Sequence, residues 1–132
     1  RRRMILDSSA ILAILFREPD WESLLVALEG VESVSCGAPT LAETGIVLGH
    51  GHGFASGKLH HFVQEFGVTV VPFGVEHWAQ TERAYERFGT GRHRADLNFG
   101  DCLAYAVSKL AEQPLLFVGD GFSKTDITAA KH

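Results

Sequence analysis

The stretch that decides the fold lies near the C-terminus and reads Asp101-Cys102-Leu103-Ala104-Tyr105-Ala106-Val107-Ser108-Lys109-Leu110, followed after a short gap by Leu115-Leu116-Phe117-Val118. The first part has apolar residues at Leu103, Ala106, Val107 and Leu110, which is the spacing of a helix with one buried face. The second part is a short apolar run bounded by proline and glycine, as is typical of a buried strand. A helix that leads into such a strand is one unit of an α/β fold.

Three more apolar runs of the same kind precede this unit: Met4–Leu6, Val34–Cys36 and Val68–Val71. Segments with helical spacing separate them, and these are led by Ile11, Leu24 and Trp78. Strands that alternate with helices predict a compact three-layer α/β fold, with a short, mostly parallel sheet flanked by helices. We expect the glycine-rich stretch 49–53 to be a loop or a broken helix.

The length of 132 residues fits a single domain over residues 1–132, and no repeat or linker divides it. A hydrophobic content of 45% and a charged content of 21% exclude disordered and fibrous classes. No apolar run approaches the roughly 20 residues of a membrane span. The basic start turns acidic at Asp7, too soon for a secretory signal, and Cys36 and Cys102 form no C-x-x-C motif. We therefore expect a cytoplasmic protein without a disulfide framework, a zinc–cysteine site or a membrane partner.

The net charge of −4, from 12 basic and 16 acidic residues, argues against binding nucleic acid mainly through bulk positive charge. It is compatible with a metal-dependent enzyme whose carboxylates are neutralised by cations. Without Asp7, Glu43, Asp101 and Asp120, which are candidates for such a site, 12 acidic residues would balance the 12 basic ones.

The candidate carboxylates all follow predicted strands or open predicted helices. Asp7 directly follows the first strand, and Glu43 is expected in the first turn of the helix after the second. Asp101 is expected in the first turn of the last helix, Asp120 follows the last strand, and Asp126 comes six residues later. Ligands of α/β sheets bind outside the carboxyl ends of the strands, so these side chains are expected at one edge. Oxygen-only ligands suit Mg²⁺ or Mn²⁺, and the pattern predicts a phosphotransfer site.

Each carboxylate also has a purely structural interpretation. Asp7 fits a helix N-cap, Thr40 to Glu43 fits a capping box, and Asn98 to Asp101 fits a looser one. Asp120 and Asp126 suit a turn. Capping does not require convergence on one rim, however, and packing several like charges together is costly unless protons or cations compensate.

At this point the residues resemble a known family. The segments that carry the resemblance are Met4-Ile5-Leu6-Asp7-Ser8-Ser9-Ala10, the run from Arg92 to Ala106 with Leu97-Asn98-Phe99-Gly100-Asp101-Cys102 at its centre, and Leu115-Leu116-Phe117-Val118-Gly119-Asp120-Gly121-Phe122. In this order they look like a PIN-domain ribonuclease of the VapC toxin type. The resemblance covers nearly the whole chain. It implies a Mg²⁺-dependent endoribonuclease (Mn²⁺ as substitute) that cuts single-stranded or loop RNA, is dimeric, and is neutralised by a VapB-like antitoxin.

The resemblance also assigns roles to individual residues. The catalytic positions are Asp7, Glu43, Asp101, Asp120 and Asp126. Of these, Asp7, Asp101 and Glu43 would hold the metal. Ser8, Ser9 and Asn98 would support those ligands by hydrogen bonds. The last motif departs from the family, because Gly121 stands where an acidic residue usually precedes the phenylalanine, so that Asp120 or Asp126 would take over its task.

A dense basic run precedes the Asp101 helix, and we predict that Arg87, Arg92 and Arg94 bind RNA phosphates, the alternative being a solvated helix end. The histidines at 50, 52, 60 and 61 match no closed zinc site and are expected in solvent. Cys102 is expected to be a small buried residue. The aromatic segment from Trp78 to Phe88 is most simply core packing, with a dimer or antitoxin groove as the alternative.

Two other functional classes stay open at the level of sequence. One is a PIN-like module that binds RNA or a partner without cutting, which the glycine at position 121 favours. The other is a receiver-type phosphoacceptor domain, which would need an acidic pair after the first strand, a phosphoacceptor Asp at the end of a middle strand and a lysine after the last strand. Asp7 stands alone, and Val68–Val71 leads into Pro72-Phe73-Gly74 without an acid.

Overall fold

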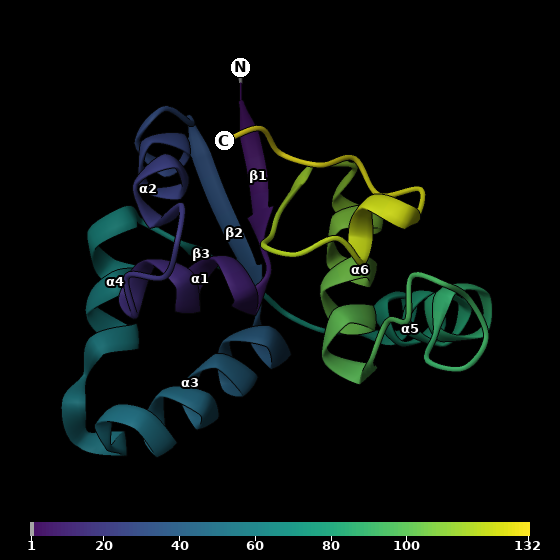
Figure 1. The fold of residues 1–132 in the computed structure, drawn as a ribbon, viewed down its shortest axis with the longest axis horizontal. Coiled ribbons are helices and arrows are strands. Elements are labelled where there is room, and N and C mark those ends of the chain that lie inside the picture. Colours follow the sequence, from purple (N-terminus) through teal and green to yellow (C-terminus); the bar gives the residue numbers. More distant parts are fainter. Residues whose placement is uncertain (1) are drawn as a thin grey trace.

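A computed structural model describes residues 2–132, and Arg1, the first residue of the basic start, lies outside them. The chain forms a parallel sheet of four strands in the order β3-β2-β1-β4 (Figure 1). The strands are β1 (Arg3–Leu6), β2 (Ser33–Gly37), β3 (Thr69–Val71) and β4 (Leu115–Leu116). They fall on the four predicted runs, which confirms the predicted parallel sheet. The last strand is shorter than predicted because the Val118 amide donates to the Ser9 hydroxyl instead of continuing the ladder.

Helices connect every pair of strands. They are α1 (Ser8–Leu15), α2 (Trp21–Glu29), α3 (Ala38–His52), α4 (Lys58–Phe66), α5 (Val75–Phe88) and α6 (Phe99–Ala111), with short 3-10 turns η1 (Phe54–Ser56) and η2 (Phe122–Lys124). Within residues 2–132, no helix is both long and apolar enough to cross a membrane.

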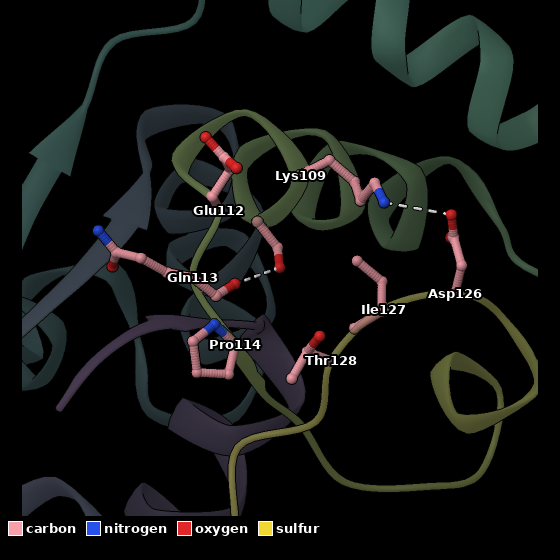
Figure 2. Close-up of a pocket in the computed structure, with 8 residues that line it drawn as sticks. Lys109, Glu112, Gln113, Pro114, Asp126, Ile127 and Thr128 are labelled. Atoms are coloured by element: carbon pink, nitrogen blue, oxygen red, sulfur yellow. Dashed lines mark hydrogen bonds and ion pairs between the residues drawn. The ribbon is translucent and has the colours of Figure 1, made fainter.

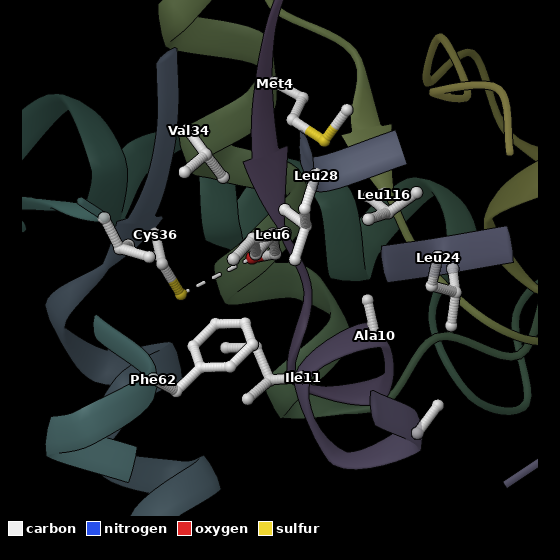
Figure 3. Close-up of a cluster of buried hydrophobic side chains, with 12 residues drawn as sticks. Met4, Leu6, Ala10, Ile11, Leu24, Leu28, Val34, Cys36, Phe62 and Leu116 are labelled. Carbon is white, nitrogen blue, oxygen red and sulfur yellow. Dashed lines mark hydrogen bonds between the residues drawn. The ribbon is translucent and has the colours of Figure 1, made fainter. Parts of the chain in front are cut away.

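The sheet lies between two helical layers, as predicted. Alternate side chains of β1 point to opposite faces, so Met4 and Leu6 pack with α1, α2 and α4 while Ile5 packs with α5 and α6. Figure 3 shows the first of these clusters, in which Phe62 and Ile11 close the core below the strands. Figure 1 shows α3 lying across the carboxyl ends of the strands.

Two local predictions on α3 are wrong. The helix continues through Gly49 and Gly51 to His52 and ends at Gly53, where φ is 82°. The ring of Phe54 packs against Gly49, so the glycines serve close packing and not a break. The helix also begins earlier than predicted, at Ala38, so Glu43 lies in its second turn and Thr40 forms no capping box with it. The glycine pattern alone does not contain this packing contact.

The topology marks where a ligand site is expected. Strand β1 pairs with β2 on one side and with β4 on the other, and the chain reverses direction across the sheet between these two neighbours. Ligands of open α/β sheets bind outside the carboxyl ends of the strands at such a switch point. Here these ends lead into Asp7 after β1 and into Val118 to Asp120 after β4.

Gly37 lets α6 approach the sheet closely. It ends β2 with ordinary backbone angles, φ −64° and ψ 142°, so conformation does not require glycine there. A Cβ at this position would lie 2.8 Å from the Val107 Cγ2 atom of α6. The missing side chain therefore sets the depth at which α6, and with it Asp101, sits on the sheet.

We predict that Gly37→Ala lowers the free energy of unfolding by about 1–3 kcal/mol, because the new methyl overlaps Val107. The matched control is Gly45→Ala inside α3, whose methyl would lie 3.6 Å from Leu59 Cδ2, an ordinary contact. That change is expected to stabilise the protein by about 0.5–1 kcal/mol through helix propensity. Urea unfolding at neutral pH measures both, and effects of the same sign would contradict the close-approach argument.

Candidate functional site

A cleft of about 420 Å³ opens at the switch point. It is lined by residues from the end of β1 and the start of α1, from the loop before α6 and its first turn, and from the segment after β4: Asp7, Ser9, Arg94, Ala95, Asp96, Leu97, Asp101, Val118, Gly119, Asp120, Gly121, Phe122 and Lys124. The structure thus brings together three of the five carboxylates named from the sequence, Asp7, Asp101 and Asp120.

Asp7 is the buried centre of this cleft. Its amide donates to the Leu116 carbonyl at 3.0 Å, which ties the end of β1 to β4. Its Oδ2 caps α1 and accepts from the Ser9 amide at 3.1 Å and from the Ser9 hydroxyl at 2.6 Å. The Ser9 hydroxyl in turn accepts from the Val118 amide at 3.0 Å. The carboxylate is only 3% exposed, and its Oδ1 is buried without a partner within the described chain.

Asp101 is held by the capping box predicted at the start of α6. The Asn98 Oδ1 accepts from the Asp101 amide at 2.9 Å, and the Asp101 Oδ2 accepts from the Asn98 amide at 3.0 Å. Asp101 therefore caps the helix and lines the cleft at the same time, because the capping hydrogen bond uses only one of its two carboxylate oxygens.

Glu43 reaches the site from α3. Its carboxylate lies against Gly100, where any Cβ would overlap it. This contact explains the glycine that precedes Asp101, because a side chain there would displace Glu43. The Oε1 of Glu43 is buried without a partner among residues 2–132. Glu43 is outside the residues that line the acidic cleft, and it also borders an apolar groove beside α5.

Burial raises the pKa of all three carboxyls, and the charge of at least one neighbouring carboxylate adds to each rise. Burial raises the pKa of Asp7 from 3.8 to about 6; the Ser9 hydrogen bonds oppose this rise, and the charges of Asp101 and Glu43 add to it. Burial likewise raises the pKa of Glu43, opposed by Ser8 and increased by Asp101. The pKa of Asp101 is raised by burial and by Asp96, against the hydrogen bond from Asn98. The three groups therefore share one electrostatic environment.

These carboxylates fit a divalent cation in their chemistry. Among residues 2–132, no three His, Cys, Asp or Glu side chains are close enough in this arrangement to enclose a metal ion. The buried Asp7 Oδ1 and Glu43 Oε1 nevertheless lack partners, and each carboxyl pays a burial cost that a cation would offset. Oxygen donors suit Mg²⁺ and Mn²⁺. Asp7, Glu43 and Asp101 are the residues that could hold such an ion.

Asp126 lies away from the cleft. It accepts from the Tyr105 hydroxyl at 2.7 Å and from Lys109 Nζ at 3.2 Å, and Arg87 lies 3.3 Å away. Figure 2 shows Asp126 facing Lys109 at the rim of a separate pocket of about 240 Å³. Partial burial works against ionisation, but the hydrogen bonds from Tyr105 and Lys109 and the nearby positive charges hold the pKa of Asp126 below its ordinary value. The structure therefore ties Asp126 to α5 and α6.

The three arginines predicted to bind RNA lie at different places in the structure. Arg94 lines the acidic cleft, Arg92 lines another groove along α5, and Arg87 pairs with Asp126. Sequence reasoning did not find Lys124, which also lines the cleft and lies 3.5 Å from Asp120. Its spacing of four residues from Asp120 could have indicated this ion pair, but residues four apart are neighbours only where the segment is helical.

Three smaller predictions have clear outcomes. The histidines at 50, 52, 60 and 61 are exposed, as predicted. Cys102 is fully buried, as predicted. The segment from Trp78 to Phe88 is only partly core: Phe88 is buried, whereas Trp78 is 62% exposed.

The fold and site define a class, a small α/β domain with a parallel sheet and an acidic cleft at its switch point. The PIN-domain family matches residues 4–127. Ribonuclease VapC36 of Mycobacterium tuberculosis is 45% identical over 126 residues, which cover 94% of this chain and 91% of that protein. The chain belongs to the PIN-domain family, among the VapC ribonucleases.

Solved structures agree with this fold. The crystal structure of Mycobacterium tuberculosis VapC20, described as a toxin that cleaves the sarcin–ricin loop, aligns with a TM-score of 0.74 at 18% identity and covers 98% of this chain and 99% of that one. VapBC2 from Rickettsia felis, bound to a DNA fragment from its promoter, aligns with a TM-score of 0.74 at 11% identity and covers 96% of each chain.

We predict that Asp7→Asn stabilises the metal-free protein at neutral pH by about 2–3 kcal/mol, because asparagine still caps α1 but carries no buried charge. The folded pKa of Asp7, about 6, lies above its unfolded value of 3.8, so the folded state binds the extra proton and wild-type stability falls as pH rises through this window. The extra stability of Asp7→Asn over the wild type is therefore expected to vanish below about pH 4.

Chemical unfolding across this pH range measures the difference, with exposed Glu29→Gln as the control. Added Mn²⁺ is expected to reduce the difference in the free energy of unfolding between Asp7→Asn and the wild type, because it stabilises the wild-type protein. An Asp7→Asn variant that is less stable than wild type at neutral pH would contradict the cost assigned to this charge.

Proposed function

We propose that this chain is the endoribonuclease toxin of a toxin–antitoxin pair, with residues 1–132 acting as one PIN-like nuclease domain in the cytoplasm on single-stranded or loop RNA. The observation that carries the proposal is that Asp7 and Asp101 line the cleft at the switch point and that the charges of Asp101 and Glu43 both act on Asp7, in a chain of the VapC ribonuclease family. The names of the relatives, which are ribonucleases, support the reaction class. The family also makes the receiver-type alternative unnecessary.

In this proposal Asp7, Glu43 and Asp101 hold Mg²⁺, or Mn²⁺ as its substitute. When bound, the ion would supply an activated water and stabilise charge on the phosphate. The other residues prepare the site. Ser9 fixes the Asp7 rotamer and joins it to the segment after β4, and Asn98 fixes Asp101. A hydrogen bond from Ser8 favours the charged form of Glu43.

The remaining predicted site residues have other roles in this proposal. Asp120 stands at the mouth of the cleft, with 86% of its side chain exposed. Asp126 and Arg87 stabilise the C-terminal segment against α5 and α6 instead of contacting RNA. Arg94 lines the cleft and is the member of the basic run best placed to contact a phosphate there. Arg92, along α5, would contact RNA only outside the cleft.

A non-cutting PIN-like module is the second candidate, and one observation favours it. Position 121 has no side chain, and a Cβ there would lie 3.1 Å from the Ala95 carbonyl oxygen, so the cleft lacks an acid at this place. RNA cutting discriminates directly between the two candidates.

We propose a VapB-like antitoxin and a second copy of the chain as protein partners. Structural neighbours include toxin–antitoxin complexes, which supports an antitoxin. A second copy is supported by an apolar groove of about 590 Å³ between α3, α5 and the start of α6. Ile46, Trp78 and Phe99 on this face are 56%, 62% and 71% exposed, and large exposed apolar patches mark interfaces.

We predict that Asp101→Asn reduces cleavage of end-labelled single-stranded RNA by at least about 100-fold and that EDTA has the same effect, because both remove the cation. Glu112→Gln at the other end of α6 is the matched control. Asp126→Asn is expected to cut RNA but to unfold more easily, since it weakens the contacts of Tyr105, Lys109 and Arg87. Full activity of Asp101→Asn would refute the assignment.

We predict that Trp78→Glu shifts the chain from dimer to monomer in sedimentation velocity, because it places a charge on the apolar face. Val26→Glu on α2 is the control, as Val26 is 67% exposed but lies outside this groove. If both variants and the wild type have the same mass, dimerisation through this face is contradicted.

A further inference from the structure

Lys124 is a charged residue of the acidic cleft to which the proposed mechanism gives no role. It lies on η2, and its Nζ is 3.5 Å from Asp120 Oδ2. The two side chains differ in exposure: Lys124 is 35% exposed and Asp120 is 86% exposed. The lysine therefore lies against the cleft, and the aspartate projects into solvent.

The segment that carries Lys124 is firmly held. The Ser123 hydroxyl donates to the Asp120 carbonyl at 2.6 Å, and the Thr125 hydroxyl donates to the Phe122 carbonyl at 2.6 Å. Phe122 is 4% exposed, and its ring centre lies 5.1 Å from that of Phe117. The position of Lys124 relative to the end of β4 is thereby fixed.

The Asp120 side of the cleft offers few ligands for a second divalent cation. Asp126 is engaged with Tyr105 and Lys109 elsewhere, and position 121 has no side chain. Two further carboxylates line the cleft: Asp120 already faces an ammonium group, and Asp96 is exposed. The Asp7 side is different, because Asp7 Oδ1 is buried there without a partner in the described chain.

We propose that the Lys124 ammonium, in place of a second divalent cation, supplies the positive charge on the Asp120 side of the cleft and binds a phosphate of the RNA. The inference rests on the proposed function. An exposed ion pair such as Lys124–Asp120 contributes little, so a phosphate can displace the aspartate. A lysine ammonium is a compact point charge on a flexible stem, suited to a single phosphate oxygen.

The test compares wild type with Lys124→Ala, Lys124→Arg and the control Lys58→Ala, an exposed lysine at the start of α4. Equilibrium dialysis with Mn²⁺ is expected to give one ion per chain in all four. In an Asp101→Asn background, which prevents cutting, Lys124→Ala is expected to weaken RNA binding and to reduce the slope of log affinity against log salt by about 0.7. Lys124→Arg is expected to keep that slope.

Cleavage by Lys124→Ala at saturating Mg²⁺ is expected to fall about 100-fold. Two Mn²⁺ per wild-type chain, or an unchanged salt slope in Lys124→Ala, would overturn the proposal. The ion count and the salt slope need no cutting. Absence of cleavage by the wild-type chain would therefore count against the proposed function, and these two measurements would still decide the role of Lys124.

Discussion

The rest of the structure depends on the burial of the Asp7 carboxylate at the end of the central strand. A buried charge is costly, and this one is 3% exposed and close enough to Asp101 and Glu43 for their charges to raise its pKa further. The fold meets part of this cost with the amide and hydroxyl of Ser9 and leaves one oxygen without a partner. A cation near this unpartnered oxygen would offset part of the remaining cost of burying the charge.

Close packing of α6 brings the second carboxylate to the first. Gly37 allows Val107 to approach the sheet, and Gly100 allows the Glu43 carboxylate to lie against the start of the same helix. Neither glycine has a positive φ, so both serve proximity and not backbone freedom. Two missing side chains thus set the spacing among residues that are distant in the sequence, and substitutions there would act on the site through packing.

Positive charge is distributed in the molecule in two ways. Arg87 and Lys109 neutralise Asp126 outside the cleft and connect the C-terminal segment to α5 and α6. Arg94 and Lys124 instead line the cleft. A chain with a net charge of −4 can therefore present cations where a phosphate would lie while keeping an acidic centre. The apolar groove is bordered by Glu43, one of the carboxylates whose charge acts on Asp7.

The sequence by itself determined the parallel sheet, the helical layers and the positions of Asp7, Asp101 and Asp120, because short apolar runs, helical spacing and strand ends are local signals. It also placed the cap of Asp101 correctly. Only the tertiary structure decided the start of α3, the helix through Gly49 and Gly51, the separation of Asp126 from the cleft and the presence of Lys124 in it. The place of Asp126 depends on a contact between segments far apart in the chain, its hydrogen bond from Tyr105, and Gly49 packs against the ring of Phe54. A sequence pattern shows which residues carry charge, but packing decides which charges meet.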